Sequence, residues 1–111
     1  IDLLTTLHQP SSPVNKEVAF FDAAYGCESI SDALPLYYTK LVKTGMISMS
    51  DLIKLTVQSP AKALGFEAGL IEVGKKADVL LFNAKIKRMV QNKQSLYNNE
   101  ELSGEVKSFK L

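Results

Sequence analysis

The spacing of apolar residues changes at Gly65, and this change constrains the fold more than any other feature of the chain. Between residues 29 and 64, apolar side chains recur at intervals of three and four, the period of helices that bury one side. After Gly65, glycines bracket short apolar runs, a pattern typical of strands and turns. The sequence therefore predicts an α/β chain, with helices between residues 29 and 64 and strands after Gly65.

The helical part contains the start and stop signals of three helices. The first is predicted from Ser29 or Ser31 to Thr44, after which Gly45 supplies the left-handed residue that commonly ends a helix. Pro35 predicts that this helix begins late or bends, because proline donates no backbone hydrogen bond. Its predicted buried stripe consists of Ile30, Ala33, Leu34, Tyr37 and Leu41.

The second and third helices have more distinct starts. Ser48 and Asp51 have the spacing of a capping box, in which the serine hydroxyl accepts a hydrogen bond from the third backbone N–H of the helix. Ser59 followed by Pro60 predicts the start of a separate third helix, with serine as the cap and proline at the first helical position. Gly65 is expected to end it.

Strands are predicted on both sides of the helices. Residues 1–7 form a short apolar run that leads into a proline-containing loop, and residues 14–26 are expected to be an extended loop. The predicted strands after Gly65 are residues 70–73, 79–82, 85–91 and 105–109. The run at 79–82 is continuously apolar, as in a strand covered on both faces, whereas lysines at 85–91 are typical of an edge strand.

Composition argues against several classes of protein. Thirteen basic and twelve acidic residues leave a net charge of +1, with no basic stripe suited to nucleic acid. No apolar run approaches the roughly 20 residues of a membrane span. The first residues include neither a methionine nor a basic region, so we expect a chain that begins within a domain and no signal peptide. A single cysteine, Cys27, excludes an internal disulfide and favours a cytoplasmic location.

Three blocks of residues, in this order and at these distances, carry a family resemblance. The first block is Thr5-Thr6-Leu7-His8-Gln9-Pro10. The second leads from Lys16-Glu17 through Tyr25-Gly26 to Ala33-Leu34-Pro35-Leu36-Tyr37. The third joins Ser59-Pro60-Ala61-Lys62-Ala63-Leu64-Gly65 to Gly69-x-Ile71-x-x-Gly74-Lys75-x-Ala77-Asp78. Together they resemble the carboxy-terminal third of dihydroorotases, within the amidohydrolase superfamily.

The resemblance implies a metal-dependent (β/α)8 barrel with a small β-sandwich, and the interconversion of dihydroorotate and carbamoyl aspartate in pyrimidine biosynthesis. It makes residues 1–65 the last strand, loop and helices of the barrel, and residues 66–111 the carboxy-terminal share of the sandwich. One strand cannot close an eight-stranded barrel, so the remainder of the barrel is an expected partner. Zinc is expected in active full-length relatives. This chain alone lacks the three or so clustered ligands of a catalytic zinc, so we expect it to hold no cofactor.

Two residues near the end of the last expected barrel strand differ from active relatives. The family pattern there is Asp-His-Ala-Pro-His-like, and its aspartate ligates metal and takes the proton from the bridging water. Leu7 occupies the aspartate position, and an isobutyl group does neither. Ser11 occupies the position of the second histidine, which is associated with the substrate carboxylate, and supplies no positive charge. The resemblance therefore implies a chain without a catalytic residue.

His8, Ser11 and Gly26 remain candidates for vestigial substrate contacts. Each also has a plainer interpretation, because a loop histidine commonly lies on the surface and a glycine commonly serves backbone geometry. The adjacent Lys16 and Glu17 are expected to be a solvated pair that contributes less than about 1 kcal/mol. Asp78 is expected to fix a turn and not to bind metal.

Three functions remain open on these residues. A dihydroorotase-like pseudoenzyme would act as a scaffold, with aspartate transcarbamoylase or a second copy of itself as the partner that the resemblance implies. An active enzyme would need upstream ligands and another base, and the nearest carboxylate, Asp2, lies roughly 17 Å from Leu7 along a strand and on its opposite face. An independent interaction module would bind another chain at the unpaired strand edge within residues 70–82.

Overall fold

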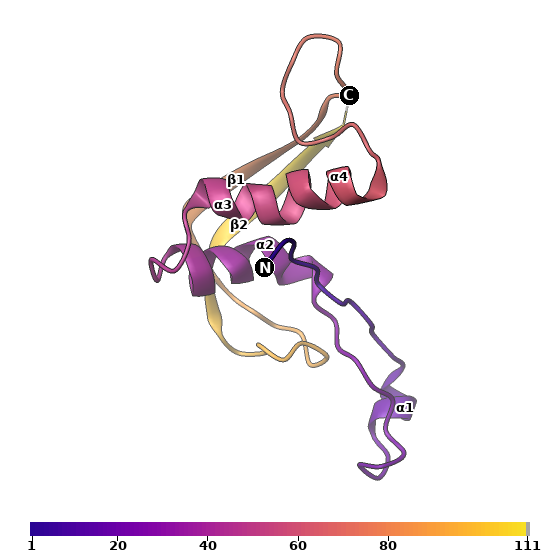
Figure 1. Ribbon diagram of the computed structural model, residues 1–111. Coiled ribbons are helices and arrows are strands. Elements are labelled where there is room, and N and C mark those ends of the chain that lie inside the picture. Colours follow the sequence, from indigo (N-terminus) through magenta and orange to yellow (C-terminus); the bar gives the residue numbers. More distant parts are fainter. Residues whose placement is uncertain (111) are drawn as a thin grey trace.

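The computed structural model describes residues 1–110, and within this range the side chains of residues 1–107. Two antiparallel strands form a twisted ribbon, with helices on one side and a long arm that extends away (Figure 1). The elements are α1 (Pro13–Lys16), a 3-10 turn (Ile30–Asp32), α2 (Ala33–Tyr37) with a π turn (Tyr38–Val42), α3 (Met49–Ile53) with a π turn (Lys54–Gln58), α4 (Ser59–Leu64), β1 (Asp78–Met89) and β2 (Glu101–Lys110). The chain is thus an α/β structure.

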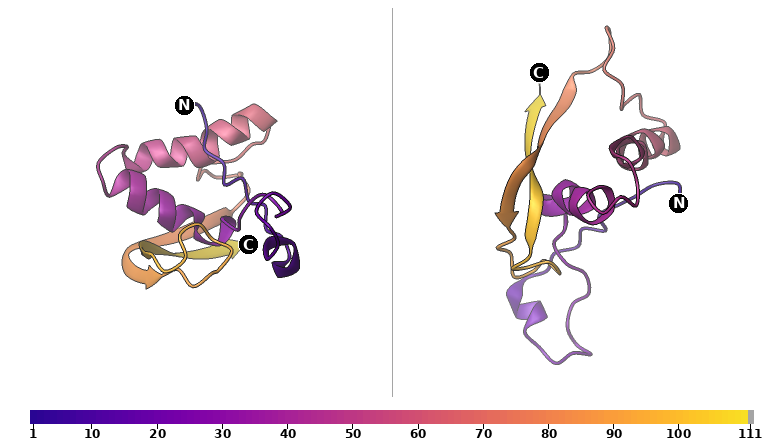
Figure 2. Two further views of the ribbon diagram at one scale, coloured as in Figure 1. Left: turned by 90° about the horizontal axis from the view of Figure 1, so that it is seen from below. Right: turned by 90° about the vertical axis from the view of Figure 1, so that its left-hand side faces the viewer.

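The described elements form three successive layers. Figure 2 shows the ribbon, then α2 with its π turn, and then the long helix made by α3 and α4. The first junction lies between α2 and the ribbon, where the rings of Tyr38 and Phe82 meet edge to face with 5.2 Å between their centroids. A second contact joins the 3-10 turn to the ribbon, where the buried carboxylate of Asp32 pairs with Arg88 of β1. These contacts fix α2 against one face of the ribbon.

The ribbon is interrupted at a bulge. Asn83 pairs with Glu105 and Lys87 pairs with Ser103, so three residues of β1 face the single residue Gly104 of β2. Gly104 has a φ of 123°, and a Cβ placed there would lie 2.3 Å from the ring of Phe82. Since the aromatic ring occupies the space of the missing side chain, this position requires glycine.

The predicted starts and ends of the helices are confirmed in part. Ser48 and Asp51 form the predicted capping box, and the Ser48 hydroxyl and backbone N–H lower the pKa of Asp51. Gly65 ends α4 with a φ of 72°, and Pro35 lies at the third residue of α2, behind a 3-10 turn. The prediction of a separate third helix is wrong. Gln58 is already helical, and the π turn (Lys54–Gln58) continues directly into α4.

The predicted buried stripe of the first helix is only partly covered. None of its five residues is fully buried: Ile30 is 62% exposed and the other four are half-buried, whereas Pro35 is buried. The ribbon covers only a narrow side of α2. The helical spacing of the apolar residues predicted a wider buried side than the described residues cover. The core of the described residues is small, and its buried apolar members are Leu52, Ala61, Val90 and Leu102.

Four predicted strands are also corrected. Residues 1–7 and 70–73 form no strand in the described chain, because a strand needs a neighbour for its hydrogen bonds and neither segment has one. Residues 79–82 and most of 85–91 belong to the single strand β1, and 79–82 are not covered on both faces, since Leu81 is 58% exposed. The last predicted strand is confirmed within β2.

A short helix lies where only a loop was predicted. The Ser12 hydroxyl accepts a hydrogen bond from the backbone N–H of Asn15 and begins α1, in which Pro13 is the first residue. Serine followed by proline is the same start signal that was recognised at residues 59 and 60. The signal at residues 12 and 13 was present in the sequence and could have predicted this helix.

The capping box at Ser48 gives a first prediction. Ser48→Ala should lower the free energy of unfolding by about 1 kcal/mol, because the backbone N–H of Asp51 loses its acceptor. Urea denaturation of the variant measures this loss. Ser50→Ala, in the same helical turn, is the matched control and should show no loss of stability. Equal destabilisation by the two substitutions would contradict the capping role.

The bulge gives a second prediction. Gly104→Ala should lower the free energy of unfolding by at least about 2 kcal/mol, because a Cβ would meet the Phe82 ring and the backbone would be strained. Gly74→Ala is the control, since Gly74 has a φ of 88° but open space around it, so only the backbone strain remains. Thermal unfolding compares the two variants, and similar losses would show that the contact with Phe82 contributes nothing.

Candidate functional site

The amino-terminal segment is held by the helices and not by a sheet. The backbone N–H of Leu4 donates to the carbonyl of Leu55 at 2.9 Å. The hydroxyl of Tyr37, on α2, donates to the carbonyl of Thr5 at 3.0 Å. Burial, with a smaller contribution from Tyr97, raises the pKa of Tyr37, so this hydroxyl keeps its proton and its role as donor. Helical side chains and backbone therefore fix where the segment ends.

His8 contacts the start of the helix that contains α2. Its Nδ1 accepts hydrogen bonds from the backbone N–H groups of Ser29, at 3.1 Å, and Ile30, at 3.2 Å. The Ser29 hydroxyl donates in the opposite direction, to the carbonyl of Thr6 at 2.8 Å. His8 is thus the acceptor that caps this helix start, where Ser29 itself makes no side-chain cap.

Leu7 lies between these anchored residues and points into solvent. It is 78% exposed and has a φ of 46°, a left-handed conformation that branched residues rarely adopt. Its backbone N–H makes a long contact of 3.5 Å with the hydroxyl of Thr5. The side chain offers no atom that binds a cation or accepts a proton.

Ser11 and Gly26 contact neighbouring segments through their backbones. The N–H of Ser11 donates to Oε1 of Gln94 at 3.1 Å, which links the loop to the turn between β1 and β2. Gly26 has a φ of 89°, and a Cβ there would lie 2.6 Å from the carbonyl oxygen of Gln9. Next to it, the N–H of Gln9 donates to the carbonyl of Cys27. Gly26 permits this close approach of two backbones.

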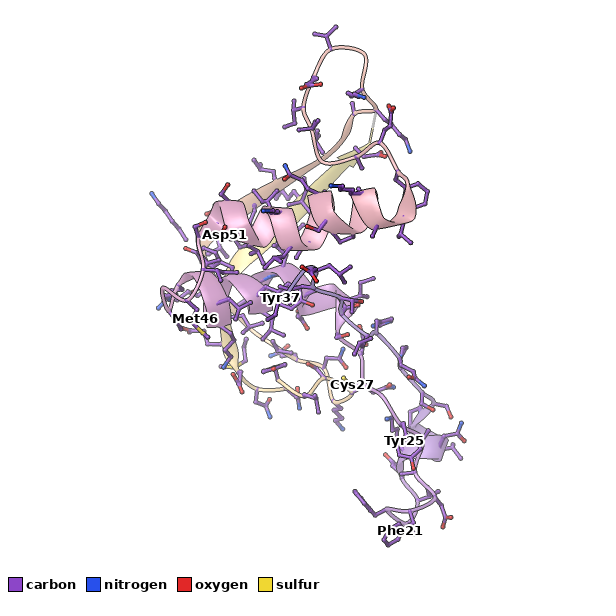
Figure 3. The ribbon with its side chains drawn as sticks, viewed as in Figure 1. Phe21, Tyr25, Cys27, Tyr37, Met46 and Asp51 are labelled. Carbon is purple, nitrogen blue, oxygen red and sulfur yellow. The ribbon has the colours of Figure 1, made fainter. Side chains whose placement is uncertain are left out.

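Residues 9–27 form an arm that projects from the body of the molecule. Lys16 Nζ donates to the carbonyls of Ala24, at 2.7 Å, and of Gly26, so its ammonium group ties the two sides of the arm together. The expected pair with Glu17 does not form. The rings of Phe20 and Phe21 meet edge to face at the tip and are about nine-tenths exposed. Figure 3 shows Phe21 and Tyr25 in the arm, far from α2, α3 and α4.

Lys16 gives a third prediction. Lys16→Met should make chymotrypsin cleave at the aromatic residues of the arm roughly tenfold faster, because two charge-assisted hydrogen bonds that close the arm are lost. Limited proteolysis followed by mass spectrometry locates and times the cuts. Lys93→Met, outside the arm, is the matched control and should cleave at the original rate. An unchanged rate for Lys16→Met would show that the arm is held by other contacts.

A polar cluster that sequence analysis missed joins the helix start to the β1–β2 turn. Glu28 accepts from the Ser31 hydroxyl at 2.6 Å and from the Asn92 side-chain amide at 2.7 Å, and these two bonds lower its pKa. The backbone N–H of Glu28 also donates to the carbonyl of Gln94. No signal in the sequence pointed to the cluster, because Glu28 and Asn92 are 64 residues apart.

The described residues do not fit a catalytic zinc. Within residues 1–110, no three His, Cys, Asp or Glu side chains gather closely enough to hold a metal ion. Leu7 has no ligand atom, and Nδ1 of His8 is already an acceptor for two backbone N–H groups. Asp78 lies at the start of β1 and pairs with Lys76 at 2.9 Å. Asp2 lies in a different place, at an open groove of about 850 Å3 between the first residues and α3 with α4.

Two of the three candidate contact residues lie together, and the third is close to them. His8 and Ser11 share the loop that follows the first segment, and Gly26 faces Gln9 of the same loop. The structure therefore gathers the positions that the sequence analysis selected, although each of them contacts backbone or the neighbouring turn. The anchoring residues Ser29 and Tyr37 were not selected as site residues, because a serine and a tyrosine at helical spacing carry no such signal by themselves.

Comparison with known proteins assigns the family. The sequence model of the amidohydrolase family matches residues 22–108, so the chain belongs to that family. Within it, the chain is similar to dihydroorotases. A dihydroorotase of Elusimicrobium minutum is 36% identical over 102 residues, which cover 92% of this chain and 22% of that protein. A probable dihydroorotase-like protein of Helicobacter pylori is 36% identical over 106 residues, or 96% of this chain and 28% of that protein.

Solved structures of cyclic amidohydrolases share the fold of this chain. Dihydropyrimidinase from Brevibacillus agri superposes with a TM-score of 0.80 at 24% identity, over 89% of this chain and 24% of that one. D-hydantoinase from a Bacillus species superposes with a TM-score of 0.78 at 26% identity, over 89% of this chain and 25% of that one. The chain thus spans about a quarter of the length of these relatives. The predicted resemblance to the dihydroorotase-like amidohydrolases is confirmed.

None of the helices formed by residues 1–110 combines the length and the apolar character that crossing a lipid bilayer demands.

Proposed function

We propose that the chain is the carboxy-terminal part of a dihydroorotase-like barrel protein of pyrimidine biosynthesis that does not catalyse the reaction. In this proposal, residues 1–65 supply the last strand, loop and helices of a (β/α)8 barrel, and residues 66–111 supply a share of a β-sandwich. The similarity to about a quarter of the length of dihydroorotases and hydantoinases supports it. So does segment 1–7, which forms no strand although its apolar sequence is typical of one.

The shape of the chain supports a role inside a larger protein. Its radius of gyration is 16.1 Å, whereas a self-contained domain of this length has about 13 Å. Large apolar side chains in the loop before β1 and in β1 are exposed, and they include Leu70, Ile71, Val73, Leu80 and Leu81. Other residues that cover them would form the core that the chain itself lacks. An autonomous interaction module of these residues is therefore the weaker proposal.

Leu7 carries the proposal that the protein is not catalytic. It occupies the place where the family resemblance implies a carboxylate that binds metal and accepts a proton, and it presents an aliphatic side chain to solvent there. Removal of a general base costs roughly 10²–10⁴ in rate, and a missing metal ligand adds to that loss. Ser11, in the place of a histidine, contributes no positive charge for a substrate carboxylate.

An active enzyme with a substitute base has less support. Asp2 is the nearest carboxylate on the same segment, and it lies at the groove beside Lys54 and Lys62, away from the loop that contains His8. A non-catalytic protein acts by binding. Aspartate transcarbamoylase and a second copy of the same protein are the partners that the dihydroorotase resemblance favours.

The fourth prediction tests the role of Leu7 in the full protein that contains this chain. The unmodified protein should not turn over dihydroorotate, and Leu7→Asp should raise turnover by at least about 100-fold, because it restores the proton acceptor and ligand. Turnover is followed spectrophotometrically, and bound zinc is measured by elemental analysis. Leu3→Asp, which adds the same charge four residues earlier in the segment, should leave both values unchanged.

Two outcomes would overturn the proposal. Ordinary turnover by the unmodified protein, with stoichiometric zinc, would show that another group replaces the missing carboxylate. No gain in turnover or zinc content for Leu7→Asp would show that Leu7 is not the cause of inactivity.

A further inference from the structure

His8 is bound through one ring nitrogen only. Nδ1 accepts from two backbone N–H groups, those of Ser29 and Ile30, at 3.1 and 3.2 Å. These N–H groups begin the 3-10 turn that leads into α2, where Ser29 provides no cap through its own side chain. The first N–H groups of a helix have no partner within the helix, so an outside acceptor stabilises its start.

This geometry fixes the tautomer of His8. A ring nitrogen that accepts a hydrogen bond carries no proton, and in a neutral imidazole the proton is then on the other nitrogen. With two donors directed at Nδ1, the hydrogen is assigned to Nε2. In an imidazolium, Nδ1 would also carry a hydrogen, and this N–H would point at the N–H groups of Ser29 and Ile30. In its neutral form, His8 is therefore the tautomer protonated at Nε2, and its free edge presents an N–H donor.

The serine that donates to His8 also binds back to the same segment. Ser29 Oγ donates to the carbonyl of Thr6 at 2.8 Å, while its N–H donates to His8. The residues on both sides of Leu7 are thus attached to one residue at the helix start. Because Thr6 and His8 are both fixed, the backbone between them closes through the left-handed conformation of Leu7, with a φ of 46°.

We propose that His8 is a positioning residue: as the Nε2-protonated tautomer it caps the helix start at Ser29 and, with the Thr6 bond, sets the direction of residue 7. His8 then supplies no lone pair to a metal ion, since Nδ1 is occupied and Nε2 is protonated. Any ligand that reaches the loop meets a hydrogen-bond donor, Nε2–H, at this position. The inference rests on the backbone contacts and not on the proposed function.

The fifth prediction compares two substitutions of His8 in the full protein that contains this chain. His8→Asn keeps an acceptor, Oδ1, where Nδ1 lies, whereas His8→Gln moves its acceptor to the place of Nε2. Hydrogen exchange of the Ser29 and Ile30 amides should remain slow in His8→Asn. It should become roughly tenfold faster in His8→Gln and in His8→Ala, as expected for the loss of a helix cap.

A spectroscopic measurement tests the tautomer itself. In the unmodified protein at about pH 8, where histidine side chains are generally neutral, long-range ¹H–¹⁵N spectra should show an unprotonated Nδ1 and a protonated Nε2 for His8. The resonance is assigned by its loss in His8→Gln. A protonated Nδ1, or equal exchange rates in His8→Asn and His8→Gln, would overturn the proposal.

The outcome of this experiment is separate from that of the Leu7 experiment. Amide exchange and imidazole protonation are measured without substrate or metal, so a catalytically active protein would leave the inference about His8 intact. Conversely, a protonated Nδ1 would overturn the role of His8 while leaving the consequence of Leu7 unaltered.

Discussion

The attachment of α2 to the β1–β2 ribbon is the contact on which the rest of the structure depends. At the bulge, the backbone N–H of Ser103 donates to the Thr39 hydroxyl at 2.9 Å, and the same hydroxyl donates to the carbonyl of Pro35 at 2.7 Å. The Phe82 ring lies between Tyr38 and the bare backbone of Gly104. Because only glycine leaves room for that ring, one residue in β2 determines how closely the helix approaches the ribbon.

From this junction, contacts pass outward to the amino-terminal segment. The helix fixed by the ribbon presents Tyr37 to the carbonyl of Thr5, and its first turn presents two N–H groups to His8. The candidate site is therefore positioned by hydrogen bonds from a helix. This explains how a segment without a strand partner nevertheless has a defined course.

The exposed apolar side chains of β1 and the leucine at position 7 have different consequences: the first affect stability, and the second affects the chemistry of the site. The exposed side chains of β1 concern folding, because a chain with so small a core gains stability from residues that cover them. Leu7 concerns chemistry, because its neighbours hold the backbone in place while the side chain lacks a functional group.

Sequence alone predicted the features that depend on a few neighbouring residues. The capping box of Ser48, the left-handed end at Gly65 and the strand within β2 were all predicted, because local backbone preferences decide them. The family was also recognisable, because its motifs are contiguous stretches. The separate helix at Ser59 was wrong for a related reason: the local signal is real, but the preceding turn was already helical and continued through it.

Only the tertiary structure decided the features that join distant parts of the chain. The spacing of apolar residues showed which side of α2 could be buried, but not that the ribbon covers so little of it. From the sequence, His8 was a candidate for a substrate contact or a surface residue. Its partners, Ser29 and Ile30, are more than 20 residues away in the sequence. Hydrogen bonds across such separations depend on how the elements pack, and packing is a property of the whole fold and not of any one segment.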